Sequence, residues 1–142
     1  MYKTLTKSIN SKYEKLIITY PLDRHHPPEI KDGVIQFCEE NNKKFEVIAA
    51  FKNDDLKKGV VYIVLTENDR ADLIKGARIM GYELGKDIGI ISFNETVFKE
   101  LLDITVITTD FEEMGRKTAE LMLQNEAAVI KNAFKIIIRK SL

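Results

Sequence analysis

The stretch VVYIVLTENDRADLIKGARIMGYELGKDIGIISF, residues 60–93, decides the fold class of this chain. Residues 60–65 and 88–93 are continuous apolar runs, which is typical of strands buried on both faces of a parallel sheet. Between them, residues 68–85 have the apolar spacing of an amphipathic helix and end at glycines. A strand, a helix and a strand in this order predict a βαβ unit with a right-handed crossover.

The same alternation continues along the rest of the 142-residue chain. Four further β-branched segments predict strands, and two further amphipathic stretches predict helices. These strands are residues 15–20, 45–51, 104–109 and 134–140, and these helices are residues 28–42 and 110–125. The sequence therefore predicts an α/β fold in one domain, with a mostly parallel, doubly wound sheet flanked by helices.

The helix ends carry their own signals. Pro28 falls in the first turn of the helix that it opens. Asn68 or Asp69 is expected to cap the helix at residues 68–85. Asp110 is followed three residues later by Glu113, which is the spacing of a capping box, so a helix should begin there.

The composition argues against several partners. Lys and Arg number 22 and Asp and Glu number 22, so no net charge favours nucleic acid or an anionic membrane. The N-terminus has no apolar signal-peptide core, and no run reaches the roughly 18 apolar residues of a membrane span. The single cysteine, Cys38, lies in an apolar helical pattern and is expected to be an inert core thiol. We expect a cytoplasmic protein without a membrane partner.

Polar residues follow most of the predicted strands. In an open parallel sheet, ligands bind outside the carboxyl ends of the strands, where loops and helix N-termini converge. Donors and acceptors of this kind suit a polyhydroxylated ligand such as a sugar, but they also cap helices and shape turns without any ligand. The residues concerned are Asp23, Arg24, His25, His26, Asn68, Asp69, Asn94, Glu95, Thr109 and Asp110.

The sequence favours neither a metal nor a cofactor. Side chains of adjacent residues, such as His25 and His26, are expected to point in different directions, and no further His or Cys stands at ligand spacing, so we expect no metal site. There is no nucleophile elbow, no Walker motif and no dinucleotide glycine fingerprint, so we expect no catalytic residue. A phosphorelay receiver would need a lysine where Thr109 and Asp110 stand. An enzyme of the doubly wound type stays a third hypothesis.

Several motifs follow one another along the chain, namely Asn68-Asp69, Gly85-Lys86-Asp87-Ile88, Ser92-Phe93-Asn94-Glu95, Thr108-Thr109-Asp110-Phe111 and Met114-Gly115. Their order resembles the C-terminal part of lactose-repressor-type (LacI/periplasmic-binding-protein-like) effector domains. The stretches HHPPEIKDGVIQFCEENN and GKDIGIISFNET are especially similar to hybrid regulators that join a GntR-type winged helix to this effector domain. Asn94 stands where the family commonly has an aspartate.

The resemblance implies that residues 1–142 are the effector-binding C-terminal lobe of a bacterial transcriptional regulator. The first lobe and a DNA-binding winged-helix domain would be absent from this segment. The effector would be a small molecule, a sugar or related polyol, the assembly a homodimer, and the protein not an enzyme. A solute-binding protein of the same fold is the alternative. The residues expected to contact the ligand are Arg24, His25, His26, Asn68, Asp69, Asn94 and Thr109.

In the family that the chain resembles, the helix after the Thr-rich crossover packs on the first lobe. The stripe of Phe111, Met114, Leu121 and Met122 would here lack that sheet. An exposed apolar stripe of this kind seeks a partner. We therefore expect the segment either to self-associate or to fold this helix back on its own sheet.

Overall fold

The structure is a computed structural model that describes residues 2–22 and 26–142, with the backbone alone described for residues 2–5. Strands and helices alternate along these residues, as the sequence predicts. The elements are α1 (Tyr2–Lys12), β1 (Lys15–Thr19), α2 (Pro28–Glu40), β2 (Lys44–Ile48), the short 3₁₀ helix η1 (Asn53–Asp55), β3 (Val60–Val64), α3 (Glu67–Met80), β4 (Ile88–Phe93), α4 (Val97–Leu101), β5 (Thr105–Thr109), α5 (Phe111–Gln124) and β6 (Phe134–Ile137).

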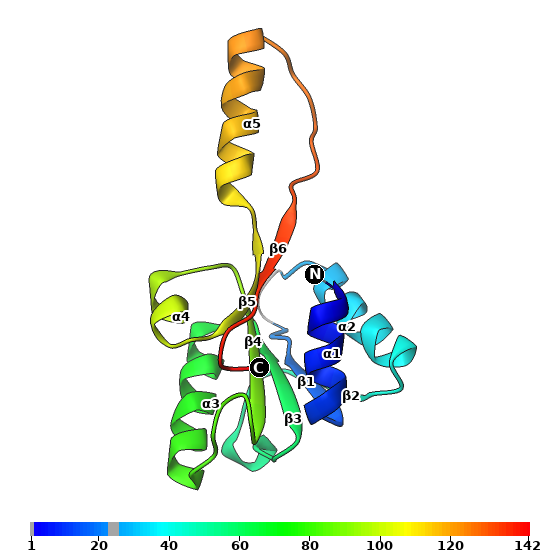
Figure 1. Cartoon of the computed structure of the whole chain (residues 1–142), viewed down its shortest axis with the longest axis vertical. Helices are drawn as coiled ribbons and strands as arrows, with labels where there is room; N and C mark the ends of the chain where they lie inside the picture. Colours follow the sequence, from blue (N-terminus) through cyan, green and yellow to red (C-terminus); the bar gives the residue numbers. More distant parts are fainter. Residues whose placement is uncertain (1, 23–25) are drawn as a thin grey trace.

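The strands form one sheet in the order β2-β1-β3-β4-β5-β6. The first four neighbouring pairs are parallel, and β6 runs antiparallel to β5. Helices α1 and α2 lie on one side of the sheet, and α3 and α4 lie on the other (Figure 1). The prediction of a mostly parallel α/β sheet flanked by helices is confirmed.

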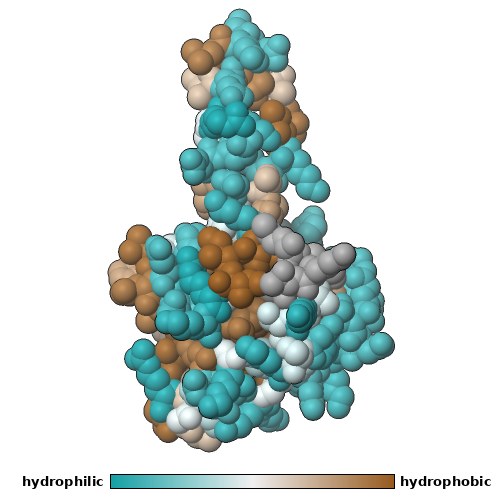
Figure 2. All heavy atoms as spheres, in the orientation of Figure 1, coloured by the Kyte–Doolittle hydropathy of each residue, from teal (hydrophilic) through white to brown (hydrophobic). Residues whose placement is uncertain are grey.

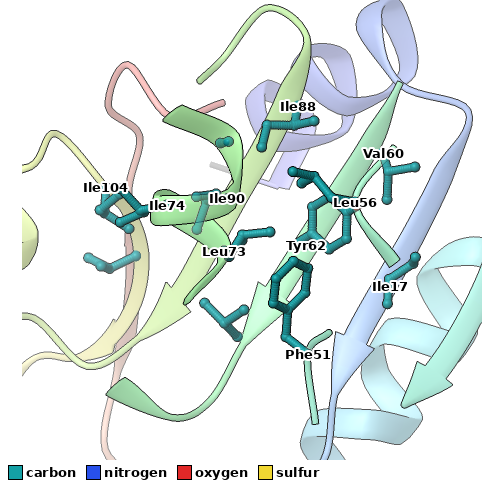
Figure 3. Close-up of a cluster of buried hydrophobic side chains, with 13 residues drawn as sticks. Ile17, Phe51, Leu56, Val60, Tyr62, Leu73, Ile74, Ile88, Ile90 and Ile104 are labelled. Atoms are coloured by element: carbon teal, nitrogen blue, oxygen red, sulfur yellow. The ribbon is translucent and has the colours of Figure 1, made fainter. Parts of the chain in front are cut away.

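The alternation of side chains along each strand builds two apolar cores. Tyr62 and Ile90 face α3, where they pack with Leu73 and its neighbours (Figure 3). Ile63 and Ile91, one residue further along, face the other side. There they meet residues of α1 and α2, including the fully buried Cys38, so the expected core position of this thiol is confirmed. Burial on both faces explains why the central strands are continuous apolar runs.

Some predicted boundaries are wrong. Strand β2 ends at Ile48 rather than Phe51, and its side chains are mostly exposed because it lies at the edge of the sheet. Strand β6 ends at Ile137 rather than at residue 140. The cap of α3 is Thr66, whose hydroxyl accepts a hydrogen bond from the Asp69 amide. Neither Asn68 nor Asp69 is therefore the cap that the sequence predicted.

Helix α5 stands apart from the rest of the molecule. It rises away from the sheet, and a long connection returns the chain to β6 (Figure 1). The predicted cap is confirmed, because the Asp110 carboxylate accepts a hydrogen bond from the Glu113 amide at 3.2 Å. No residue of α5 is buried. The expectation that this helix folds back on its own sheet is wrong, while self-association stays a prediction.

Candidate functional site

The carboxyl ends of the parallel strands meet at one edge of the sheet. Val64 of β3 is paired with Ser92 of β4, so these two strands end side by side. Strand β5 ends beside them at Thr109, which is paired with Phe134 at the start of the antiparallel β6. Residues from four segments of the chain therefore come together at the edge where an open parallel sheet binds ligands.

A groove of about 650 Å³ opens at this edge and continues over the face that α1 and α2 cover. Its floor is apolar, because it is formed by strand residues that face α1 and α2 and by side chains of these two helices. Four polar residues line it, and these are His26, Glu29, Asn94 and Thr109. The apolar lining residues include Ile9, Leu16, Ile30, Val34, Phe37, Ile63, Leu65, Ile91, Phe93, Ile107, Phe134 and Ile136.

Asn94 has an exposed side chain and a backbone conformation that is uncommon for residues other than glycine. Its φ of 60° lies in the left-handed region, which Asn tolerates better than most residues. Its backbone N–H donates a hydrogen bond to the Ile107 carbonyl at 2.9 Å, which holds the end of β4 against β5. The sequence prediction that Asn94 and Thr109 would meet at one rim agrees with their shared place in the groove.

His26 lines the groove from the segment before α2. The Tyr20 hydroxyl donates to the His26 backbone carbonyl at 2.6 Å, and the two rings pack edge to face with centroids 6.0 Å apart. The Nε2 atom of His26 is buried and has no hydrogen-bond partner among the described residues.

Asp69 has a different setting from these residues. Only 7% of it is exposed, and both carboxylate oxygens already accept hydrogen bonds. One bond comes from the Phe51 amide at 2.9 Å and the other from the Thr66 hydroxyl at 2.6 Å. The side chain therefore ties the connection after β2 to the first turn of α3. Asn68 is exposed on the same turn but does not line the groove.

The remaining polar candidates are either partnered or outside the described residues. Arg24 and His25, with Asp23, fall in the undescribed segment 23–25. The Glu95 carboxylate pairs with Arg139 at 2.6 Å. The pKa of the Asp110 carboxyl is lowered, mainly because the carboxylate accepts a hydrogen bond from the Glu113 backbone amide. These two carboxylates thus have structural partners at the rim.

Sequence reasoning missed the apolar part of the groove and one buried charge. Phe93 lines the groove and directly precedes Asn94, and the lining residue Glu29 lies in the first turn of α2, close to His26. Their nearness in sequence to predicted site residues could have identified both. Lys99 was not singled out, yet only 4% of it is exposed. Its burial, followed by the nearby charge of Arg70, lowers the pKa of the Lys99 ammonium.

The described residues hold no group of three or more His, Cys, Asp and Glu side chains placed to bind a metal ion. Burial raises the pKa of the Cys38 thiol to about 11, so this thiol is protonated near neutral pH. The polar lining of the groove consists of amide, hydroxyl, imidazole and carboxylate groups. Such a set can donate and accept hydrogen bonds around a small polar ligand.

No protein-family model and no curated protein matches the chain. Solved structures do match it. A LacI family transcriptional regulator from Arthrobacter sp. FB24 superposes with a TM-score of 0.73 at 16% identity, over 98% of this chain and 61% of that one. A LacI family transcriptional regulator from Bifidobacterium animalis subsp. lactis gives a TM-score of 0.71 at 15% identity, over 98% of this chain and 59% of that one.

A third match is a periplasmic binding protein/LacI transcriptional regulator from Alkaliphilus metalliredigens, complexed with D-xylulofuranose. Its TM-score is 0.69 at 15% identity, over 98% of this chain and 61% of that one. The fold is that of a LacI/periplasmic-binding-protein-like lobe. The chain spans about three fifths of the length of these proteins. Among the described residues, no helix has both the length and the apolar character to cross a membrane.

Proposed function

We propose that this chain is the ligand-sensing part of a bacterial transcriptional regulator, in which a small molecule modulates DNA binding by a separate N-terminal domain. The observation that carries the proposal is the groove at the carboxyl edge of the sheet, with His26, Asn94 and Thr109 at its rim. A polar rim that includes the Glu29 carboxylate, over an apolar floor, suits a sugar or related polyol, whose hydroxyls would meet the rim and whose carbon faces would lie on the floor.

The regulator is further proposed to be of the GntR–LacI hybrid type and to act in the cytoplasm without enzymatic activity. The motifs HHPPEIKDGVIQFCEENN and GKDIGIISFNET support the hybrid type by their similarity to such regulators. The ligand would work by binding one arrangement of two lobes more tightly than another, which shifts the population of DNA-binding states. A first lobe is the proposed partner of α5, whose apolar stripe has no partner among the described elements.

A homodimer is the proposed assembly. Helix α4 supports it, because Val97, Phe98 and Leu101 are 77%, 71% and 76% exposed. Apolar atoms gather over this helix and at the foot of the arm that α5 and β6 form (Figure 2). Exposed apolar clusters of this kind commonly mark contacts between subunits.

A solute-binding protein that serves uptake is the second candidate. The match to a protein described as both a periplasmic binding protein and a LacI regulator favours it. Both candidates use the same groove, so ligand binding alone does not separate them. Specific binding of a DNA fragment by a longer chain that includes this segment would support the regulator, and its loss or gain with ligand would measure the coupling.

The ligand proposal is tested by a thermal-shift screen of pentoses, hexoses, deoxy sugars and nucleosides. At ten times the dissociation constant, a ligand stabilises the native state by about 1.4 kcal/mol, which raises the melting temperature by roughly 4 °C for a chain of this size. The Thr109→Val variant should lose that shift, whereas Thr118→Val, on α5 outside the groove, should keep it. A panel without any response, or an equal response of both variants, would contradict the proposal.

A further inference from the structure

The loop between β4 and α4 is fastened from several sides. The Asn94 amide donates to the Ile107 carbonyl at 2.9 Å, and the Glu95 amide donates to the Thr108 hydroxyl at 3.0 Å. The Glu95 carboxylate pairs with Arg139 at 2.6 Å. The loop that carries a groove residue is therefore held by three polar contacts, two to β5 and one to Arg139 after β6.

The buried side chain of Lys99 adds further hydrogen bonds to the same loop. Its side chain turns back from α4, and its ammonium donates to the carbonyl of Phe93 at 2.6 Å and to that of Asn94 at 2.8 Å. The same ammonium lies 3.9 Å from a carboxylate oxygen of Glu67 in the first turn of α3. One cation therefore links the end of β4 to the first turn of α3.

Burial of the Lys99 ammonium near a second cation costs free energy. Lys99 is 4% exposed, and Arg70, another cation, is 5% exposed and pairs with Glu67. Burial first, and then the charge of Arg70, lowers the pKa of Lys99, while Glu67 and Glu95 act in the opposite direction. Lys99 is buried, but the side chain of its ion-pair partner Glu67 is 68% exposed, so this long ion pair contributes little against the desolvation of the ammonium. Stability alone therefore does not explain a lysine at this place.

We propose that Lys99 is a positioning residue of the ligand rim, which holds Asn94 in its left-handed conformation at the groove and ties it through Glu67 to the first turn of α3. The proposal rests on the proposed function, because it takes the groove as the ligand site. A preorganised rim pays less conformational entropy when a ligand binds, since its polar groups are already in place. Lys99 itself does not line the groove.

Amide hydrogen exchange of the 142-residue chain tests the proposal without any ligand. Lys99→Met keeps most of the side-chain volume but removes the donors, so exchange of the Asn94 and Glu95 amides should accelerate at least about tenfold through local opening. The Ile90 amide of β4, which donates to the Ser141 carbonyl in the C-terminal turn, should keep its rate. Lys99→Arg, which retains donors, should restore slow exchange in large part.

The matched control is Lys75→Met, which removes a lysine whose side chain is 71% exposed on α3. It should leave all these amides unchanged. Unchanged exchange at Asn94 and Glu95 in Lys99→Met would overturn the proposal. Equal acceleration throughout the sheet would also overturn it, because Lys99 would then act on global stability rather than on the rim.

If Lys99→Met does not fold, the wild-type chain decides. The carbonyl carbon shifts of Phe93 and Asn94 should follow the titration of Lys99, with a midpoint below the 10.5 of an ordinary lysine. The charged groups that face Lys99 are Arg70, Glu67 and Glu95. Carbonyl shifts that stay constant while Lys99 titrates would overturn the proposal. Since no ligand is present, either outcome leaves the ligand screen to test the groove separately.

Discussion

Asn94 combines two properties that substitution separates. Its φ of 60° favours Gly or Asn over other residues, and its side chain lies at the groove. Asn94→Ala should lose about 1 kcal/mol of unfolding free energy, because a Cβ without a local polar group disfavours the left-handed region. Asn94→Gly should stay within about 0.5 kcal/mol of the parent chain in urea unfolding, because glycine tolerates this conformation.

Both Asn94 variants lack the side-chain amide, so both should weaken binding of any sugar that the thermal-shift screen identifies. Equal stability of the two variants would show that the backbone conformation costs nothing. Undiminished ligand affinity in Asn94→Gly would remove this residue from the site.

Asp69 is expected to behave as a structural residue. Asp69→Ala would leave the Phe51 amide without its partner, and we expect a loss of about 2–3 kcal/mol in unfolding free energy, since a buried donor is then unsatisfied. Asp69→Asn keeps one carbonyl acceptor and should lose less than half of that. Urea denaturation measures both. A loss below about 0.5 kcal/mol for the alanine variant would argue that the two hydrogen bonds are not formed in solution.

At this scale the sequence locates residues better than it assigns their contacts. Asn94 and Thr109 were predictable because parallel strands end at one edge of a sheet, whatever the details of packing. The engagement of Asp69 was not, because its partner Phe51 lies 18 residues earlier and reaches it only in the folded chain. The burial of Lys99 was not predictable for a different reason, because the carbonyls of Phe93 and Asn94 come together on its ammonium only when the chain turns back after β4.

The capping of α5 has a pH dependence that belongs to the element. The Glu113 amide lowers the pKa of Asp110 below its ordinary value of 3.8. A depressed carboxyl pKa contributes stability above the unfolded value and loses it as the pH falls through the folded value. We therefore expect the Glu113 amide shift to be constant from neutral pH to about pH 5 and to change with a midpoint below 3.8.

Asp110→Asn is the control for this titration, because asparagine caps a helix without titrating. In that variant the part of the change that follows Asp110 should disappear, and only the part due to the Glu113 carboxyl itself, whose pKa Arg116 lowers, should stay. The helix content by circular dichroism should stay the same. A titration midpoint at or above 3.8 in the parent chain would contradict the cap.

Elements differ in how far periodicity defines them. Strands β3 and β4 were predicted to within a residue because burial on both faces leaves a continuous apolar run. Strand β2 was placed too long because it lies at an edge, where exposed residues weaken the pattern. Helix α4 was missed because five residues are too few for a helical period to show. For α5, the stripe identified the helix but not the surface that the stripe contacts.

Two apolar surfaces of the whole molecule compete as the site of self-association. Sedimentation velocity should show dimers of the 142-residue chain, and Phe98→Glu should weaken the dimer at least about tenfold by burying an unpaired charge at the α4 contact. Phe98 is 71% exposed, so the substitution should not disturb the monomer fold.

Leu123→Glu is the matched variant on the arm, where the leucine is 88% exposed. It should leave a dimer formed through α4 intact. Dissociation by Leu123→Glu alone would assign the contact to α5 instead. A parent chain that is monomeric at all concentrations would contradict self-association through either surface.

The proposed function depends most on ligand binding in the groove at the carboxyl edge of the sheet. The most direct measurement is chemical-shift mapping of the isotope-labelled chain, titrated with the sugar that ranks highest in the thermal-shift screen. The account predicts saturable shifts confined to the groove, led by His26, Asn94 and Thr109, with α3 and the η1 turn unaffected. Shifts centred elsewhere on the molecule, or no saturable shift with any member of the panel, would contradict it.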